Sequence, residues 1–193
     1  MAAVTVTKKA GGRTREQAEK AMEAIDVYSE RGPDGTQRLG WKWAVLKQPG
    51  WQASVSFEIH APRNIAFDGK THNGALTVED VTGNVRAVTH NGTVKVASEG
   101  EKLHAETHNG GVAVDFAGSE VKLITHNGSV DADLRRCGVV SGTIGTHNGK
   151  VNLIVGQNTS ADLVCETHNG AIQCDVPVKD RKVTRRRLTG RLV

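Results

Sequence analysis

The stretch ETHNGGVAVDF, residues 106–116, contains one of six identical Thr-His-Asn-Gly tetrapeptides, and these copies decide the predicted fold of the chain. The copies begin at Thr71, Thr89, Thr107, Thr125, Thr146 and Thr167. Successive copies therefore lie 18, 18, 18, 21 and 21 residues apart. A fixed period near 20 residues is typical of stacked repeats, in which each repeat packs on its neighbours.

Apolar residues alternate with other residues on both sides of the tetrapeptide. Val121, Leu123 and Thr125 alternate into one copy, and Val112 and Val114 alternate after another. A period of two predicts strands with one buried face. Each repeat is thus predicted to hold two strands, joined by the Asn-Gly turn and by a second, variable turn. The additional residues of the longer repeats are expected in that second turn, where insertions are tolerated.

Two architectures place two strands in each repeat. Asn-Gly is a strong hairpin signal, which would favour an antiparallel meander. In a solenoid, by contrast, each Asn-Gly corner lies about 4.8 Å from the same corner of the next coil, so identical residues touch. Because that contact favours identity, we predict an all-β solenoid of about six coils with a small α/β N-terminal cap.

Each residue of the tetrapeptide then has a distinct expected role. Thr shares the inward parity of the valines, and His has the opposite parity and should point outward. Asn is expected to tolerate a left-handed conformation and to bond to its stacked copies, and Gly supplies positive φ. The predicted structural turn residues are Asn73, Gly74, Asn91, Gly92, Asn109, Gly110, Asn127, Gly128, Asn148, Gly149, Asn169 and Gly170.

The two ends of the chain differ from the repeats. Residues 1–60 are predicted to form a strand–helix–strand cap, because Thr14 and Gln17 read as a capping box before a helix. The solenoid is expected over residues 61–178. Residues 179–193 are basic and alternate in the same way, so they are expected to be the start of a further coil or a tail.

Composition narrows the possible partners. The net charge is +4, and the basic C-terminal run has no nucleic-acid-binding motif beside it, so no nucleic-acid partner is predicted. No stretch reaches the roughly 18 apolar residues of a membrane helix, so no membrane span is predicted. The first residues lack the apolar run of a signal peptide, so the chain as written is expected to be cytoplasmic.

The chain resembles a bacterial adhesin-like family, a domain family of unknown function with Thr-x-Asn-Gly β-solenoid repeats. The resemblance rests on VSFEIHAP at residues 55–62, the repeated turns, and THNGAIQCDVPV at residues 167–178, and it covers nearly the whole chain. It implies a cell-envelope or extracellular location and no enzymatic activity. Histidine before every Asn-Gly departs from the family, which tolerates varied residues there.

The outward histidines are the candidate metal ligands. Neighbouring imidazoles about 4.8 Å apart could share a weakly bound zinc, copper or nickel ion, with Glu106 or Glu166 or water completing its shell. The alternative is that the imidazoles only stack, and we favour it, so no cofactor is expected. The candidate residues are His72, His90, His108, His126, His147 and His168.

The remaining function classes are ordered by their sequence support. No catalytic motif is present, and Glu79, Asp80, Asp131 and Asp133 form no convergent pair recurring across coils, so no enzyme is predicted. The favoured function is a non-catalytic scaffold that meets an unknown protein or glycan partner. An open coil end would also permit a homo-oligomer or an end-to-end assembly. A carbohydrate-active β-helix protein is the distant alternative; the tryptophans at 41, 43 and 51 are expected to pack the cap rather than to bind sugar.

Overall fold

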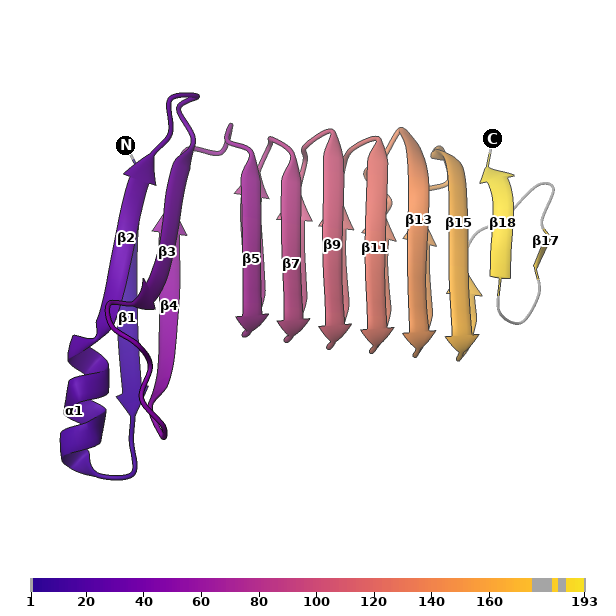
Figure 1. The fold of residues 1–193 in the computed structure, drawn as a ribbon. Helices are drawn as coiled ribbons and strands as arrows, with labels where there is room; N and C mark the ends of the chain where they lie inside the picture. The colour runs from indigo at the N-terminus through magenta and orange to yellow at the C-terminus, as the bar shows by residue number, and fades with distance from the viewer. Residues whose placement is uncertain (1, 175–181, 184–186, 193) are drawn as a thin grey trace. The chain divides into compact units, whose positions relative to one another are not determined.

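The chain folds into two compact units, residues 1–61 and residues 62–193 (Figure 1). The structure is a computed structural model that describes residues 2–174, 182–183 and 187–192. No helix in this described part of the chain is long and apolar enough to cross a membrane.

The N-terminal unit has the predicted strand–helix–strand order. β1 (Ala3–Gly11) pairs antiparallel with β4 (Gln52–His60), and β2 (Ile25–Arg31) pairs antiparallel with β3 (Gln37–Trp43). Thr14 caps α1 (Arg15–Glu23) by accepting a hydrogen bond from the Gln17 amide at 3.2 Å. The Gln17 side chain accepts from the amide of Arg13 instead of from Thr14, so the capping box is shifted by one residue.

The tryptophans of this unit pack against one another and against the helix. Trp51 is buried with Ala21 and Ala24. The ring centroids of Trp43 and Trp51 lie 5.5 Å apart, and those of Trp41 and Trp43 lie 5.7 Å apart. Large aromatic rings commonly serve such packing.

The second unit is the predicted β-solenoid, in which each of about six coils gives one strand to each of two parallel sheets (Figure 1). We call the sheet whose strands end in the repeated Asn the ladder sheet. Its coil strands are β5 (Phe67–Asn73), β7 (Val85–Asn91), β9 (Lys102–Asn109), β11 (Glu120–Asn127), β13 (Val139–Asn148) and β15 (Ser160–Asn169). The second sheet contains β6 (Leu76–Val81), β8 (Val94–Ser98), β10 (Val112–Phe116), β12 (Val130–Leu134), β14 (Val151–Val155) and β16 (Ile172–Cys174).

The register of the ladder sheet places each tetrapeptide beside the next. Thr107 pairs with Thr125 and Asn109 with Asn127, and the same pairing continues through every coil. The parallel pairing confirms the solenoid and excludes the meander of hairpins for this region.

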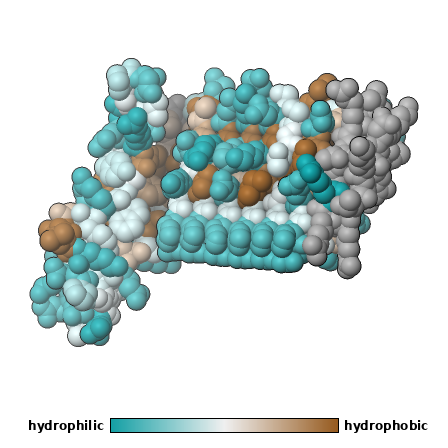
Figure 2. Space-filling view, turned by 45° about the vertical axis from the view of Figure 1, so that its right-hand side comes forward, coloured by the Kyte–Doolittle hydropathy of each residue, from teal (hydrophilic) through white to brown (hydrophobic). Residues whose placement is uncertain are grey.

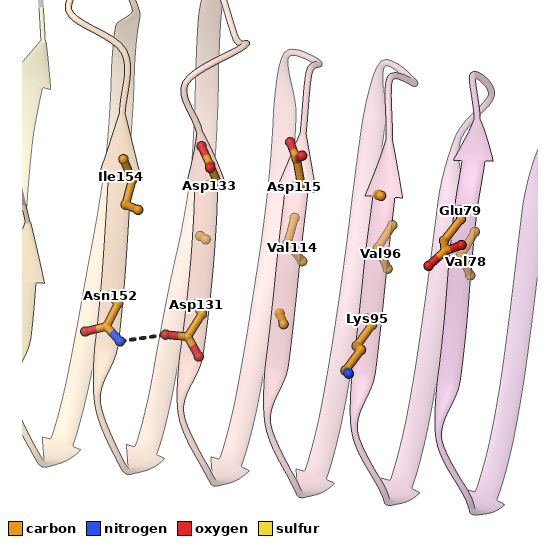
Figure 3. Close-up of a pocket in the computed structure, with 13 residues that line it drawn as sticks. Val78, Glu79, Lys95, Val96, Val114, Asp115, Asp131, Asp133, Asn152 and Ile154 are labelled. Atoms are coloured by element: carbon orange, nitrogen blue, oxygen red, sulfur yellow. Dashed lines mark hydrogen bonds between the residues drawn. The ribbon is translucent and has the colours of Figure 1, made fainter.

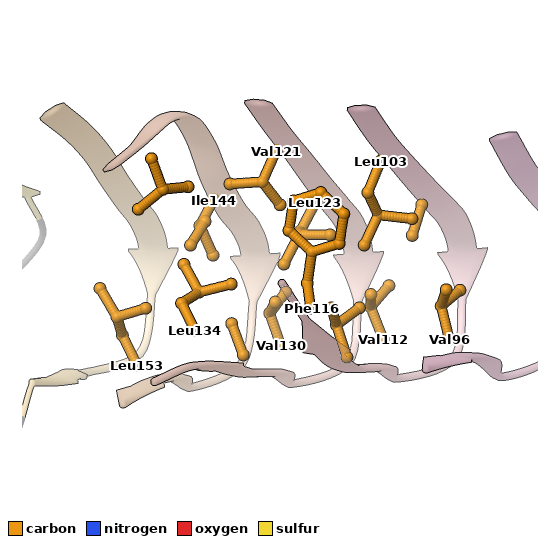
Figure 4. Close-up of a cluster of buried hydrophobic side chains, with 14 of the residues drawn as sticks. Val96, Leu103, Val112, Phe116, Val121, Leu123, Val130, Leu134, Ile144 and Leu153 are labelled. Atoms are coloured by element: carbon orange, nitrogen blue, oxygen red, sulfur yellow. The ribbon is translucent and has the colours of Figure 1, made fainter. Parts of the chain in front are cut away.

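A single apolar core lies between the two sheets (Figure 4). Leu103, Leu123 and Ile144 face inward from the ladder sheet, and Val112 and Leu134 face them from the second sheet. The repeated threonines are buried from the second copy onward, as their parity predicts. The core is built mainly from Val, Leu, Ile and Ala, with Phe116 as its largest fully buried side chain.

The two longer coils place their additional residues at the second corner, as expected, but these residues are only partly in the turn. They also lengthen the start of the next ladder-sheet strand, because β13 and β15 have 10 residues whereas β9 and β11 have 8. Cys137 lies in one of these turns and is buried, and its thiol donates a hydrogen bond to the Phe116 carbonyl at 3.2 Å. Burial raises the pKa of the Cys137 thiol. The Thr159 hydroxyl of the next coil donates to the Cys137 carbonyl at 2.7 Å, so the insertions stack on each other.

The C-terminal segment departs from the expectation of a further coil. β18 (Arg187–Leu192) pairs antiparallel with β15 along Ala161–Glu166, and β17 (Lys182–Val183) pairs antiparallel with β18. A further coil would have paired parallel, so that prediction is wrong for the described residues. The alternation within this segment does not encode strand direction, because the same period of two fits either orientation. β18 therefore covers the end of the ladder sheet that was expected to be open.

Candidate functional site

The repeated corner is held together by hydrogen bonds between successive coils. Each tetrapeptide Thr from Thr89 onward donates its hydroxyl hydrogen bond to the carbonyl of the tetrapeptide Gly in the preceding coil, at 2.7–3.1 Å. The amide of each tetrapeptide Gly from Gly74 to Gly149 donates to the carbonyl of the tetrapeptide Asn in the following coil, at 2.8–3.0 Å. A Cβ at Gly110 would lie 2.1 Å from the Gly92 carbonyl oxygen, and Gly110 has φ of +150°. Only glycine permits this approach and this backbone conformation.

The asparagine side chains form a continuous amide ladder along the corner. Each amide nitrogen donates to the amide oxygen of the preceding coil at 2.7–2.9 Å. The expected bonding between stacked copies is therefore confirmed. The expected left-handed conformation is wrong, because Asp80 is the one described non-glycine residue with positive φ. Asn is needed at this position for its side chain, which both donates and accepts.

The six histidines form a second ladder beside the asparagines. Neighbouring ring centroids lie 4.6–4.8 Å apart and neighbouring ring planes differ by 2–7°. Five of the six rings are exposed, and His108 is half-buried. The Nδ1 atom of His108 is buried without a hydrogen-bond partner among the described residues. Figure 2 shows the polar edge of the solenoid as a straight hydrophilic band across the coils.

The ladder stands at one side of a groove of about 1100 Å³ that crosses all six coils. The outward residues two positions before each histidine lie in this groove: Lys70, Val88, Glu106, Ile124, Gly145 and Glu166. A third outward row, next along the same strands, includes Arg86, His104 and Lys122. The groove therefore combines repeated imidazoles with charges of both signs and short apolar side chains.

The carboxylates expected to complete a metal shell have other partners. Glu106 contacts His104 Nε2 at 3.0 Å, and Glu166 accepts from Arg187 Nε at 2.9 Å. Among the described residues, no group of three or more His, Cys, Asp or Glu side chains is arranged to hold a metal ion. Zinc, copper or nickel at the six histidines stays a prediction.

A smaller hollow of about 340 Å³ lies on the outer face of the second sheet (Figure 3). Asp131 and Asp133 both line it from β12, and Glu79 lines it from β6. Asn152 donates to Asp131, and a hydrogen bond from Arg135 lowers the pKa of Asp133. Asp80 lies outside the hollow, with Arg63 nearby. Asp80, Asp131 and Asp133 thus pair with side chains of neighbouring coils and turns.

Two contacts of the groove were not anticipated from the sequence. The His104–Glu106 pair could have been found, because the same alternation that turns His108 outward also turns these two residues outward. The Glu166–Arg187 pair joins a coil to the antiparallel strand β18, which no repeat pattern predicts.

Comparison with protein-family models, with curated proteins and with solved structures finds no match. The resemblance to the adhesin-like family therefore stays a prediction that rests on the residues quoted for it.

Proposed function

We propose that the protein is a non-catalytic β-solenoid scaffold of a bacterial cell envelope or outer surface, which binds an extended partner along the groove beside the histidine ladder. The observation that carries this proposal is the repetition of the same imidazole and amide groups in every coil, 4.6–4.8 Å apart between ring centroids, beside one continuous groove.

The repetition favours binding over catalysis. A catalytic site brings different groups together at one point, where a nucleophile, a base and a stabilising donor converge. The groove instead offers similar groups at regular intervals along its length. An extended partner can then make one weak contact with each coil, and linked weak contacts give high overall affinity.

The chemistry of the groove suits a polar, chain-like partner. Imidazole and amide groups donate and accept hydrogen bonds, as hydroxyl-rich glycans and polypeptide backbones also do. The charges of Lys70 and Arg187 lie in the same groove as those of Glu106 and Glu166, so the surface has no strong preference for one sign. We therefore place envelope polysaccharide first among the partners and an extended protein segment second.

A substitution that fills the groove tests this proposal. Gly145 lies on the groove floor, and a Cβ there would come no closer than 3.5 Å to a neighbouring atom, so Gly145→Arg adds bulk with little backbone strain. Ala113→Arg makes the matched change in the hollow of the second sheet. We expect purified wild-type protein and Ala113→Arg to co-sediment with an envelope polysaccharide fraction in EDTA, and Gly145→Arg to bind at least tenfold more weakly.

Three results would contradict the proposal. Wild-type protein that binds neither the envelope fraction nor a glycan or peptide array would remove its basis. Equal binding by Gly145→Arg would place the interaction outside the groove. Release of new reducing ends from the polysaccharide would favour the carbohydrate-active alternative, and the acidic hollow of the second sheet would then be the place to look for catalytic groups.

A further inference from the structure

The orientation of the histidine rings limits how they can hold a metal ion. A metal bound to imidazole lies in the ring plane, about 2.0–2.1 Å from the nitrogen for zinc. Two nitrogens on one tetrahedral ion are therefore roughly 3.3 Å apart and their ring planes converge on it. Neighbouring rings of the ladder are instead parallel to within 7° and 4.6–4.8 Å apart between centroids. Neighbouring rungs, as they stack, cannot share one ion.

The carboxylates beside the ladder do not supply a second metal ligand from the same chain either. Glu106 and Glu166, the carboxylates nearest in sequence to the ladder, contact His104 and Arg187. Each stacked imidazole can thus give an ion one strong protein ligand. A single imidazole holds zinc, copper or nickel weakly, so a second ligand has to come from another molecule.

We propose that the ladder binds Zn²⁺, Cu²⁺ or Ni²⁺ between two copies of this chain, with each ion held by one imidazole from each copy. Parallel stacking, which prevents neighbours from sharing an ion, allows two facing rings to lie in one plane with the ion between them. Waters complete the coordination shell. The inference rests on the proposed interaction face, and it names a second copy as one partner of that face.

The period of the ladder selects this partner. A second copy repeats its imidazoles at the same 4.6–4.8 Å, so an imidazole can stand opposite every rung. An extended peptide running along the ladder repeats its side chains on one face about every 6.6 Å, and it loses register after a few rungs. A matching period turns several weak ion sites into one multivalent interface.

The outward row beside the ladder indicates the relative direction of the two copies. When the coils of the second copy run in the opposite order, Lys70 of the first coil faces Glu166 of the last coil, and Val88 faces Gly145. When both copies run in the same order, Lys70 faces Lys70 and Glu106 faces Glu106. Opposite charges across an interface favour the first arrangement. The pair is therefore expected to have reversed coil order.

Light scattering on the whole chain tests the proposal. We expect the molar mass to double when ZnCl₂, CuCl₂ or NiCl₂ is added at neutral pH and to return to the monomer value in EDTA. A ladder variant with His90→Gln, His126→Gln and His168→Gln should need at least tenfold more metal. The control His60→Gln changes a histidine of the N-terminal unit, outside the ladder and the groove, and should dimerise as the wild type does. Circular dichroism melts verify that each variant is folded.

Several outcomes would overturn the proposal. These are a mass that stays monomeric at saturating metal, metal bound by the monomer as shown by equilibrium dialysis, or a folded ladder variant that dimerises at the wild-type metal concentration. Lys70→Glu should weaken the pair severalfold, and an unchanged midpoint would overturn the reversed coil order. If the wild-type protein does not dimerise with metal but binds the polysaccharide in EDTA, only this inference is rejected. If it dimerises with metal but binds no polysaccharide, only the polysaccharide partner of the proposed function is rejected.

Discussion

Each coil turns twice, and the two corners follow different rules. The Thr-His-Asn-Gly corner repeats the same side chains in every coil, and each Asn bonds to its neighbouring copies. The second corner varies in sequence and length and uses individual contacts, such as Arg136 bridging Glu99 and Asp115. A side-chain ladder requires the same residue in every coil, whereas a contact made by a single coil does not.

Glycine, unlike asparagine, is required at both corners of the shorter coils, because the backbone of the preceding coil lies too close for a Cβ. A Cβ at Gly100 of the second corner would lie 2.0 Å from the Gly83 carbonyl oxygen. In a longer coil, by contrast, a Cβ at Gly138 would have nothing within 4 Å. Close stacking of backbone therefore explains the glycines, whereas only the repeated corner needs Asn.

The largest expected effect is at a stacked glycine. Gly110→Ala places a Cβ against the Gly92 carbonyl and forces positive φ on alanine, and it should lower the free energy of unfolding by about 3 kcal/mol or more. Gly138→Ala at the second corner should change it by less than about 1 kcal/mol. Urea unfolding measures both. Equal effects would show that backbone approach at the repeated corner is not what requires glycine.

A smaller effect is expected at the amide ladder. Asn109→Ala removes one bond to Asn91 and one from Asn127, and it should cost about 1–2 kcal/mol of unfolding free energy. Asn73→Ala, at the first rung, removes the ladder bond that Asn73 accepts from Asn91 and should cost about half as much. Asn84→Ala removes a single bond to the Lys102 amide at the second corner. If Asn109→Ala cost no more than Asn84→Ala, the ladder would add nothing beyond isolated hydrogen bonds.

The smallest effect is expected at the exposed ion pairs of the second corner. Arg136→Ala removes contacts to Glu99 and Asp115 and should cost about 0.2–1 kcal/mol, and less in high salt. Thermal melts at two salt concentrations check this. A cost above that of Asn109→Ala would reverse the proposed order of the two corners.

The nearby Asp133 has a lowered pKa, so its contribution to stability is present at neutral pH and is lost as the pH falls through the acidic range.

The features that follow the repeat could be predicted, and those between unlike segments could not. The period and the inward parity of Thr107 and Val112 determine the solenoid and its core, because the same burial pattern recurs in every coil. The outward direction of His108 follows from the same parity. The pairing of β18 with β15 joins segments that share no repeat, and strand direction has no signature in alternation.

The site was predictable in position but not in geometry. Parity places the six histidines in one row, and stacking distance follows from strand spacing. The angle between ring planes depends on side-chain rotation, which sequence does not specify. That angle changes the metal hypothesis from an ion shared by neighbouring rungs to an ion shared by two molecules. The extended conformation of Asn109 was also missed, because its tolerance of left-handed φ is a preference of the residue type and not of this context.

The preserved register between coils of different length makes the solenoid a ruler. Thr125 pairs with Thr146 although the interval between them is three residues longer than in earlier coils. Because the repeated corner is the same in every coil, a duplication or loss of one coil would rejoin two surfaces that already fit at that corner. The unit can thus lengthen or shorten only by whole coils of about 4.7 Å, and each added coil supplies one imidazole and one amide.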